Sequence, residues 1–421
     1  MARSLRTFRY PRDRPLIPED DLRHQLDHAA GSVDGNADVP HDAFEHVRPV
    51  RPDPPAKNHL DRRRVHRRHA LGRRGHLRYA PPTMIQVQIS RVGGPEVLRA
   101  VEVASPPLLP DHVRIKVSAA GVNFADVHMR LGLYAEAPRM PFVPGFEVAG
   151  VVAEVGPGVR TFRRGERVLA ACRFGGYTNE IVLPASHVRR TPRKLSDKEA
   201  ASIPIAFMTA WVALVEMGRV REGDRVLVPG AAGGVGTAIV QVAARAGAHV
   251  VGVVGTAEKK DGVRALGASQ AFTYAELAAR DRPDARNFSM ILDARGGPYL
   301  KDSLRRLAPG GRAISYGVSS LVTGRKRSIP HAIWGLLQTP LLTPIGLAMA
   351  NQGIFGLNML KLFDTDEGMG LLLTAMDGML EGFQAGLFKA VVAKSFPLSN
   401  AGDAHAYLQA RKNHGKVVLT C

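Results

Sequence analysis

Hydrophobic and polar positions follow two different patterns along the chain. Between residues 84 and 205, apolar and polar residues alternate in short runs, such as 84–89, 112–117 and 166–169, and glycine or proline turns separate these runs. Alternation with a period of two is typical of strands that bury one face. The pattern therefore predicts an all-β unit over residues 84–205.

From residue 206 onward, runs of β-branched residues alternate with amphipathic segments. The runs predict strands at 225–228, 249–254, 289–292 and 312–316, and the segments predict helices at 235–246 and 258–266. Strands and helices that alternate in this way form a doubly wound parallel sheet. A last helix at 401–409 and a strand at 417–419 end the chain, so the predicted fold class is α/β.

Residues 1–83 show neither of these periodicities. The segment is rich in arginine and proline and holds eight of the 15 histidines, so we expect little fixed structure in it. Three interpretations stay open: Met84 is the true start and the upstream sequence is mistranslated, the segment is a disordered native tail, or it is a targeting peptide or nucleic-acid-binding arm. Asp13, Glu19 and Asp20 argue against a mitochondrial transit peptide, which is poor in acidic residues.

Composition and charge narrow the choice of partners. The 421 residues hold two cysteines, Cys172 and Cys421, too few for a disulfide framework or a thiolate metal cluster, and residues 1–30 lack the apolar core of a secretory signal. We therefore expect a cytoplasmic protein. The net charge of +19 is spread along the chain, with 17 basic and 11 acidic residues before Met84 and 40 and 27 from there on. A spread charge favours a polyanionic dinucleotide over nucleic acid as the partner.

A glycine-rich loop follows the strand predicted at 225–228 and precedes the helix predicted at 235–246. Residues 230–236 of this loop read Gly-Ala-Ala-Gly-Gly-Val-Gly. Glycines let the backbone turn sharply and approach a pyrophosphate, and the helix offers free N–H groups and the positive end of its dipole. This placement between a strand and a helix predicts a dinucleotide site that includes Gly233, Gly234, Val235 and Gly236.

The strand after this helix ends without the acidic residue that an NAD-selective site places about 20 residues beyond its glycines. Glu258 is the nearest carboxylate, and Thr256, Lys259 and Lys260 surround it. A hydroxyl and two cations suit a 2′-phosphate, so the site is predicted to prefer NADPH. The other interpretation is that both lysines merely solvate the start of a helix.

Four motifs occur in an order that resembles a known family. They are GVNFADV at 121–127, PFVPGFEVAGVV at 141–152, AAGGVG at 231–236 and GKVVL at 415–419. Together they resemble the quinone oxidoreductase branch of the medium-chain dehydrogenases and reductases, over residues 84–421. The resemblance implies a GroES-like catalytic domain at 84–205 with 363–421, a Rossmann NADPH-binding domain at 206–362, and a homodimer.

The positions that bind zinc in the related alcohol dehydrogenases differ here. Those enzymes carry Cys in the first motif and Gly-His-Glu in the second, where this chain has Asn123 and Gly145-Phe146-Glu147. One carboxylate without a thiolate or an imidazole does not hold Zn²⁺ in its usual coordination, so no metal is expected. Without a Lewis acid the substrate must itself be electrophilic, which favours a quinone or an activated alkene as the hydride acceptor.

The resemblance also implies which residues surround the nicotinamide. Asn123 would lie beside the nicotinamide ribose, and Thr209 and the backbone of Gly317 and Val318 would lie near the ring. Tyr134 would lie at the cofactor or substrate cleft, where it is the candidate proton donor. Two other interpretations of Tyr134 stay open, packing against the nicotinamide and a simple loop aromatic.

At the nucleotide end, the resemblance implies that Lys259 and Tyr274 contact the 2′-phosphate and that Arg411 contacts the nucleotide. Residues 293–297, Asp-Ala-Arg-Gly-Gly, match a related D-x-x-G-G motif at the edge of the sheet. Arg295 is unusual in that motif, and the sequence offers no role for it.

Residues 316–328, YGVSSLVTGRKRS, resemble the vesicle amine transport protein branch of the family. The segment that follows, at 332–355, is long and apolar, but Pro340 and Pro344 interrupt it before it reaches the roughly 20 residues of a membrane span. It is interpreted as a lid or interface helix pair, with membrane association or a true span as alternatives. Residues 353–360 are the candidate strand of a dimer interface.

Three functions stay open. The first is an NADPH-dependent reductase that transfers hydride to a quinone or another electrophilic carbonyl or alkene without zinc. The second, an enoyl-thioester or 2-alkenal reductase, would use the same cofactor site and the same hydride chemistry, and the pocket sequence does not separate it from the first. The third is a non-catalytic, membrane-associated protein that binds NADPH.

Overall fold

The computed structural model describes residues 82–280, 287–322, 324–325 and 328–421, so the interpretations of residues 1–81 lie outside the described residues. The first strand, β1 (Thr83–Ile89), begins at the change of pattern that the sequence shows near Met84. It pairs antiparallel with β2 (Leu98–Ala104) in a two-stranded sheet. The predicted strand at 84–89 is therefore confirmed.

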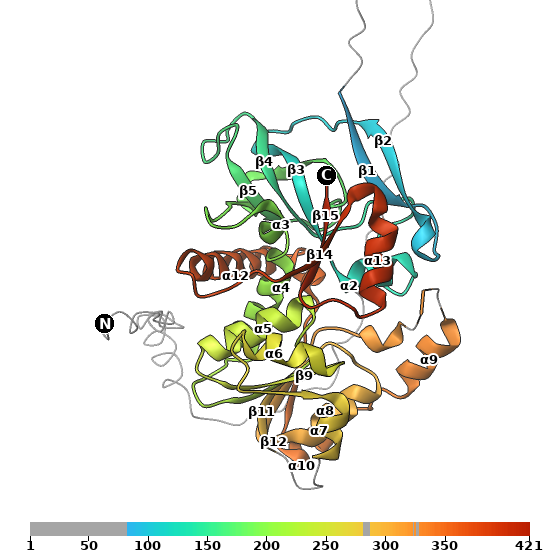
Figure 1. Cartoon of the computed structure of the whole chain (residues 1–421), viewed down its shortest axis with the longest axis vertical. Helices are drawn as coiled ribbons and strands as arrows, with labels where there is room; N and C mark the ends of the chain where they lie inside the picture. The colour runs from blue at the N-terminus through green and yellow to red at the C-terminus, as the bar shows by residue number, and fades with distance from the viewer. Residues whose placement is uncertain (1–81, 281–286, 323, 326–327) are drawn as a thin grey trace, which may run out of the picture. The chain divides into compact units, whose positions relative to one another are not determined.

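A seven-stranded sheet forms the β part of the fold (Figure 1). Its strand order is β14-β15-β3-β4-β5-β7, and β6 also pairs with β3. Val113, Ile115 and Val148, on β3 and β4, are completely buried in one core, as the alternating pattern predicts. The strands are β3 (His112–Val122), β4 (Glu147–Val155), β5 (Arg167–Ala171), β6 (Glu180–Pro184), β7 (Val188–Arg190), β14 (Val392–Pro397) and β15 (Lys416–Thr420).

Helices also occur between residues 84 and 205, so the prediction of an all-β unit is wrong there. They are α2 (Phe124–Arg130), α3 (Asp197–Ala200) and the start of α4 (Pro204–Trp211), which continues as a π-helix over Val212–Met217. Capping boxes start the first two, with Asn123 and Asp126 at α2 and Ser196 and Glu199 at α3. These short polar signals carry no hydrophobic period. The stretch Asp197–Met217 is apolar enough to cross a membrane, but 78% of its apolar 18-residue window is buried inside the fold, as in the core helix of a globular domain.

The second sheet is parallel throughout, with the strand order β10-β9-β8-β11-β12-β13. The chain moves outward from β8 to β10 on one side and from β11 to β13 on the other, so its direction reverses between β8 and β11. Ligands of doubly wound sheets bind at the carboxyl ends of the strands at such a reversal. The α/β class with a doubly wound parallel sheet is confirmed. The strands are β8 (Arg225–Pro229), β9 (His249–Val254), β10 (Gln270–Thr273), β11 (Phe288–Asp293), β12 (Leu307–Ser315) and β13 (Gly353–Gly356).

The elements predicted for this sheet are confirmed, with one difference. The four predicted strands are β8, β9, β11 and β12, and the predicted helix at 235–246 is α5 (Gly234–Arg245). The predicted helix at 258–266 is shorter: a 3-10 turn at Ala257–Lys259 leads into α6 (Lys260–Arg264), and the chain turns at Gly267, whose φ is 111°. The strand β10 and the helix α7 (Tyr274–Ala279) have four and six residues, too few for a periodicity to show. α8 (Pro298–Arg306) follows β11.

The C-terminal segment returns to the first sheet. α12 (Asp366–Gln384) packs on α4, where the rings of Phe207 and Phe383 lie 4.8 Å apart. The predicted helix at 401–409 is α13 (Ala401–Gln409). β15 then pairs antiparallel with β3, with Val417 opposite Val122. The sheet thus contains strands from both ends of the described chain, and the proposed domain boundaries remain predictions.

The apolar segment at 332–355 contains a helix pair, as one of its interpretations predicts. α9 (Ile329–Leu337) and α10 (Pro344–Ala350) have nine and seven residues, far fewer than a span of the bilayer needs. β13, at the edge of the parallel sheet, covers only the start of the strand predicted at 353–360, and α11 (Met359–Leu362) follows it. The helix pair and its connection expose large apolar side chains, namely Trp334, Leu336, Leu337, Leu341, Ile345 and Met349.

Candidate active site

The glycine-rich loop connects β8 to α5 at the carboxyl edge of the parallel sheet. Gly230 has a φ of 74°, in the left-handed region that favours glycine. A side chain at Gly236 would overlap the carbonyl oxygen of Gly230, so this position also needs glycine. Gly233 caps α5 with extended backbone, and the N–H groups of the first turn, from Gly234 and Val235 on, have no acceptor within the helix. The loop therefore fits a dinucleotide pyrophosphate.

The C-terminal GKVVL motif lies against this loop. The N–H of Gly415 donates to the carbonyl oxygen of Ala232 at 2.9 Å, and Gly233 and Gly415 form a parallel bridge. A Cβ atom at Gly234 would lie 2.5 Å from Cδ of Lys416. The start of β15 is therefore in direct contact with the predicted pyrophosphate site.

A buried cluster joins Asn123, Glu147 and Lys416, which come from three separate motifs. The ammonium of Lys416 donates to Oδ1 of Asn123 at 2.7 Å and to Oε1 of Glu147 at 2.5 Å. Nδ2 of Asn123 donates to the same Oε1 at 2.9 Å, and the N–H of Ile205 donates to Oε2 at 2.8 Å. Glu147 is completely buried and Lys416 is 5% exposed. The orientation of the Asn123 amide is therefore fixed by two charged neighbours.

Asp126 holds the backbone around this cluster. Its carboxylate accepts hydrogen bonds from the N–H groups of Asn123 at 2.8 Å and Gly145 at 2.9 Å, and from the hydroxyl of Tyr177 at 3.1 Å. Burial raises the pKa of Asp126 to about 7, although these hydrogen bonds oppose the shift. The Tyr177 oxygen also lies 2.9 Å from Nε2 of His405, whose pKa burial lowers well below its usual value. The network ties the first two motifs to α13.

Tyr134 and Thr209, two further residues predicted near the nicotinamide, lie outside this cluster. Tyr134 follows α2, is partly buried and packs against the hydrophobic core of the seven-stranded sheet. Burial raises the pKa of its phenol to about 12, with nearby carboxylates adding to the shift, so the phenol keeps its proton at neutral pH. The hydroxyl of Thr209 donates to the carbonyl oxygen of Ile205 at 2.6 Å, and the N–H of Ile205 binds Glu147. Thr209 is therefore one helical turn away from the buried cluster.

Gly317 and Val318 lie where the chain leaves β12. A Cβ atom at Gly317 would lie 2.9 Å from the carbonyl oxygen of Ala294, so this backbone packs closely against the turn after β11. The carbonyl oxygen of Val318 accepts a hydrogen bond from the ring of His128 on α2, and burial lowers the pKa of His128 to about 4. The segment therefore connects the parallel sheet to the helix that Asn123 caps.

The residues predicted at the nucleotide end come together. Nζ of Lys259 donates to the carbonyl oxygens of Arg411 at 2.7 Å and Asn413 at 2.9 Å, and burial lowers the pKa of this ammonium. The hydroxyl of Tyr274, at the start of α7, accepts a hydrogen bond from the backbone N–H of Gly230. Lys259 and Arg411 thus lie together, and Tyr274 reaches the start of the glycine loop.

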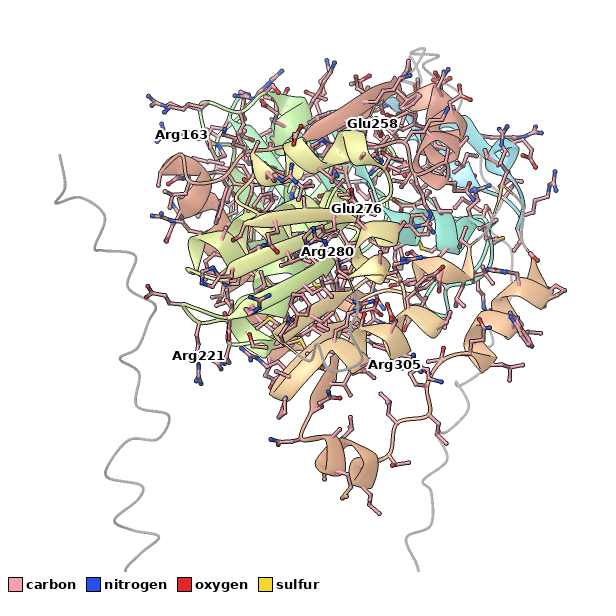
Figure 2. All side chains as sticks on the ribbon, turned by 60° about the horizontal axis from the view of Figure 1, so that its bottom comes forward. Arg163, Arg221, Glu258, Glu276, Arg280 and Arg305 are labelled. Carbon is pink, nitrogen blue, oxygen red and sulfur yellow. The ribbon has the colours of Figure 1, made fainter. Side chains whose placement is uncertain are left out.

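Lys260 and Thr256 differ from Lys259 in their partners. Lys260 forms an ion pair with Glu276 at 2.8 Å, so the protein already engages its charge. The Thr256 side chain forms a hydrogen bond with the carboxylate of Glu258, whose pKa falls as a result. In the view of Figure 2, Glu276 lies between Glu258 and Arg280. Lys260 is therefore paired with a carboxylate, whereas the ammonium of Lys259 donates to backbone carbonyl oxygens.

Sequence reasoning missed the residues that support Asn123. Lys416 was recognised only as part of the GKVVL motif, and the sequence assigned it no role. Asp126 could have been found from its spacing to Asn123, which is that of a capping box. Tyr177 and His405 are 228 residues apart, so no local signal relates them. The individual roles of the predicted site residues remain predictions.

Comparison with known proteins places the chain in a family. The alcohol dehydrogenase GroES-like domain matches residues 109–193, and the zinc-binding dehydrogenase domain matches residues 266–419. The chain is 32% identical to the human "synaptic vesicle membrane protein VAT-1 homolog-like" over 342 residues, which are 80% of each protein. It is 31% identical to human quinone oxidoreductase over 343 residues, which are 80% of this chain and 97% of that protein.

Among solved structures, the chain is similar to Escherichia coli quinone oxidoreductase complexed with NADPH. The TM-score is 0.69 at 27% identity, over 80% of this chain and all of the other. The predicted GroES-like domain beside a parallel-sheet dinucleotide-binding domain is thereby confirmed. The chain belongs to the quinone oxidoreductase family of the medium-chain dehydrogenases and reductases.

Proposed function

We propose that this chain is an NADPH-dependent reductase that transfers hydride to a quinone or another electrophilic carbonyl or alkene without zinc. The observation that carries the proposal is the buried cluster of Asn123, Glu147 and Lys416 beside the glycine loop. In this arrangement the predicted dinucleotide loop lies next to Glu147, and the ammonium of Lys416 already neutralises the charge of that carboxylate. The similarity to a quinone oxidoreductase solved with NADPH supports the same conclusion.

The cofactor fits the residues along the carboxyl edge of the parallel sheet. Gly233, Gly234 and the first N–H groups of α5 would hold the pyrophosphate, and Lys259 and Tyr274 would hold the 2′-phosphate. Asn123 binds Lys416, which lies against Gly234 of the loop, and its fixed amide would orient the nicotinamide ribose. The reduced nicotinamide, when bound, supplies the hydride, and the protein supplies orientation.

Zinc independence is supported by the chemistry of the residues at the expected metal position. Asn123 presents an amide, and Glu147 is the one carboxylate of the cluster, already bound to Lys416 at 2.5 Å. Among the described residues, no three His, Cys, Asp or Glu side chains form a group that could hold a metal ion. A divalent cation bound at Glu147 would lie next to the buried ammonium of Lys416, and the repulsion between the two positive charges makes its binding unfavourable.

A proton must follow the hydride when a quinone or an enone is reduced. We assign this step to the half-buried phenol of Tyr134, which is protonated at neutral pH as a tyrosine ordinarily is, and whose pKa burial raises to about 12. A phenol can give a proton to the developing oxyanion as a general acid while the hydride adds. The electrons thus come from the cofactor and the proton from the protein.

The test is oxidation of NADPH, followed by its absorbance, by metal-free protein with a small quinone, an enal, an enoyl thioester, or no acceptor. Fast turnover of the quinone that EDTA does not change supports the proposal. Preference for the enoyl thioester or the enal overturns the quinone assignment and favours the second reductase. Saturable NADPH binding without turnover of any acceptor overturns the enzymatic proposal and favours a binding protein.

We also propose that the chain forms a homodimer through β13. This strand is an edge of the parallel sheet, with unpaired backbone groups along one side, and the neighbouring α9 and α10 expose apolar side chains such as Trp334 and Leu337. A second copy would cover both features. Light scattering after size exclusion tests this, and a monomeric mass at micromolar concentration contradicts it.

A further inference from the structure

Arg295 lies in the turn after β11, at the carboxyl edge of the sheet and beside the reversal between β8 and β11. The turn is fixed by Asp293, whose carboxylate accepts the N–H groups of Arg295 at 3.2 Å and Gly296 at 2.9 Å. Gly296 and Gly297 have φ values of 62° and 58°, which other residues rarely adopt. The conformation of this turn therefore fixes the direction in which the Arg295 side chain leaves the sheet.

The guanidinium of Arg295 stacks on two tyrosines. Its central carbon lies 4.3 Å from the ring centre of Tyr274 and 3.2 Å from that of Tyr299. Tyr274 begins α7 and Tyr299 belongs to α8, so the two rings reach Arg295 from different elements. Stacking uses the faces of the guanidinium, and its N–H donors point outward in its plane. One of them forms a hydrogen bond with the Tyr274 hydroxyl, and the other donors are left for further acceptors.

The charges around Arg295 are unbalanced. Among the described residues, neither Arg295 nor Arg411 forms an ion pair with a carboxylate, although burial and the nearby Arg295 both lower the pKa of Arg411. The ammonium of Lys259 lies 2.7 Å from the backbone carbonyl oxygen of Arg411. The buried carboxylate of Asp293 interacts with Arg295 and offsets one of the two guanidinium charges, so an anion bound beside Arg295 and Arg411 would relieve the repulsion that remains between them. The cluster therefore points to an anionic ligand.

We propose that Arg295 is a further anchor for the 2′-phosphate of NADPH and a determinant of the preference for NADPH over NADH. The inference rests on the proposed function in its choice of cofactor. The position supports the 2′-phosphate rather than the pyrophosphate, because Arg295 packs on Tyr274 and lies near Arg411, whose backbone carbonyl binds Lys259, whereas the pyrophosphate site is at the start of α5. Its planar donors suit two oxygens of one phosphate.

The test compares Arg295→Met with the matched control Arg280→Met. Methionine keeps an apolar chain against the tyrosine rings and removes the charge. Arg280 also stacks on an aromatic ring, that of Phe272 at 4.6 Å, but it is exposed and lies at the end of α7 away from Tyr274. The two substitutions therefore remove the same kind of contact at two places.

Dissociation constants for NADPH, NADH and 2′,5′-ADP are measured by calorimetry without an electron acceptor. Arg295→Met should weaken NADPH and 2′,5′-ADP about 10- to 100-fold, the value of a charge-assisted hydrogen bond, and NADH less than about twofold. Arg280→Met should change none of the three. Equal weakening of NADPH and NADH, or no weakening, overturns the assignment.

The failure of this inference is distinguishable from the failure of the proposed function. If the unaltered protein binds NADPH no better than NADH, the proposed cofactor is wrong. If the unaltered protein prefers NADPH and Arg295→Met keeps the full preference, the cofactor stands and Arg295 only packs the turn. Quinone turnover enters neither comparison.

Discussion

Replacing Lys416 by methionine isolates the contribution of the buried ammonium to the fold. Methionine keeps most of the length of the side chain beside Gly234 and removes the charge. The carboxylate of Glu147 is then left with the Asn123 amide and the Ile205 N–H as its partners, at 2.9 and 2.8 Å. It has no access to water, because it is completely buried.

The expected loss in the free energy of unfolding follows from this burial. Removing one partner of a buried ion pair costs about 3 to 5 kcal/mol, because the remaining charge is uncompensated. The two hydrogen bonds that Glu147 keeps place the loss at the lower end, about 3 kcal/mol. Solvent screening does not reduce this value, since the side chains of Lys416 and Glu147 are 6% and 0% exposed.

The assay is equilibrium unfolding in urea, followed by circular dichroism. The matched variant combines Lys416→Met with Glu147→Gln, which removes both charges and keeps the shape of the cluster. Because the double variant leaves no buried charge, it should recover most of the stability that Lys416→Met loses.

Two results would refute this reasoning. The first is a Lys416→Met protein within about 1 kcal/mol of the unaltered chain, which is the range of an exposed pair. The second is a double variant no more stable than Lys416→Met, since that would trace the loss to packing and not to the charge of Glu147.

Three further predictions concern other parts of the site. Lys259→Glu should weaken NADPH by about 100-fold and NADH far less, because a carboxylate would repel the 2′-phosphate; equal losses in a binding titration would contradict the assignment. Tyr134→Phe should lower kcat with a quinone by about 100-fold without changing the dissociation constant of NADPH, and an unchanged kcat would exclude Tyr134 as the proton donor. The pKa of Asp126 is raised from 3.8 to about 7 in the folded chain. The stability that Asp126 contributes is therefore complete below pH about 4 and is lost as the pH rises through about 7, by up to about 4 kcal/mol. Urea unfolding at several pH values should show this dependence in the unaltered chain and not in Asp126→Asn.

The predictions that succeeded depend on short stretches of chain. The strand, glycine loop and helix around residues 225–246 were predicted in order, because apolar periodicity and the positive φ of Gly230 are local properties. The helices α2 and α3 were missed for a related reason. Their capping boxes involve only two polar residues each and are easily hidden in an alternating pattern.

The candidate site was predicted unevenly. Lys259 was named from the residues that follow its strand, Asn123 and Arg411 from the family resemblance, and the structure brings Lys259 to the backbone of Arg411. Lys260 looked equivalent to Lys259 in sequence, but its ion pair with Glu276 engages it elsewhere. Two adjacent lysines on a helical segment point in different directions, and only the neighbouring elements show that Lys259 contacts the C-terminal segment.

By itself, the sequence determined the α/β class, the glycine loop for a dinucleotide and the absence of the zinc-binding Cys and His from their usual positions. Each of these depends on residues close together in the chain. The tertiary structure alone decided that Lys416 neutralises Glu147, 269 residues away, and that Arg295 stacks between Tyr274 and Tyr299. Pairing and stacking of this kind are set by how the two sheets and their connecting helices pack, because contacts between distant segments leave no periodicity in the sequence.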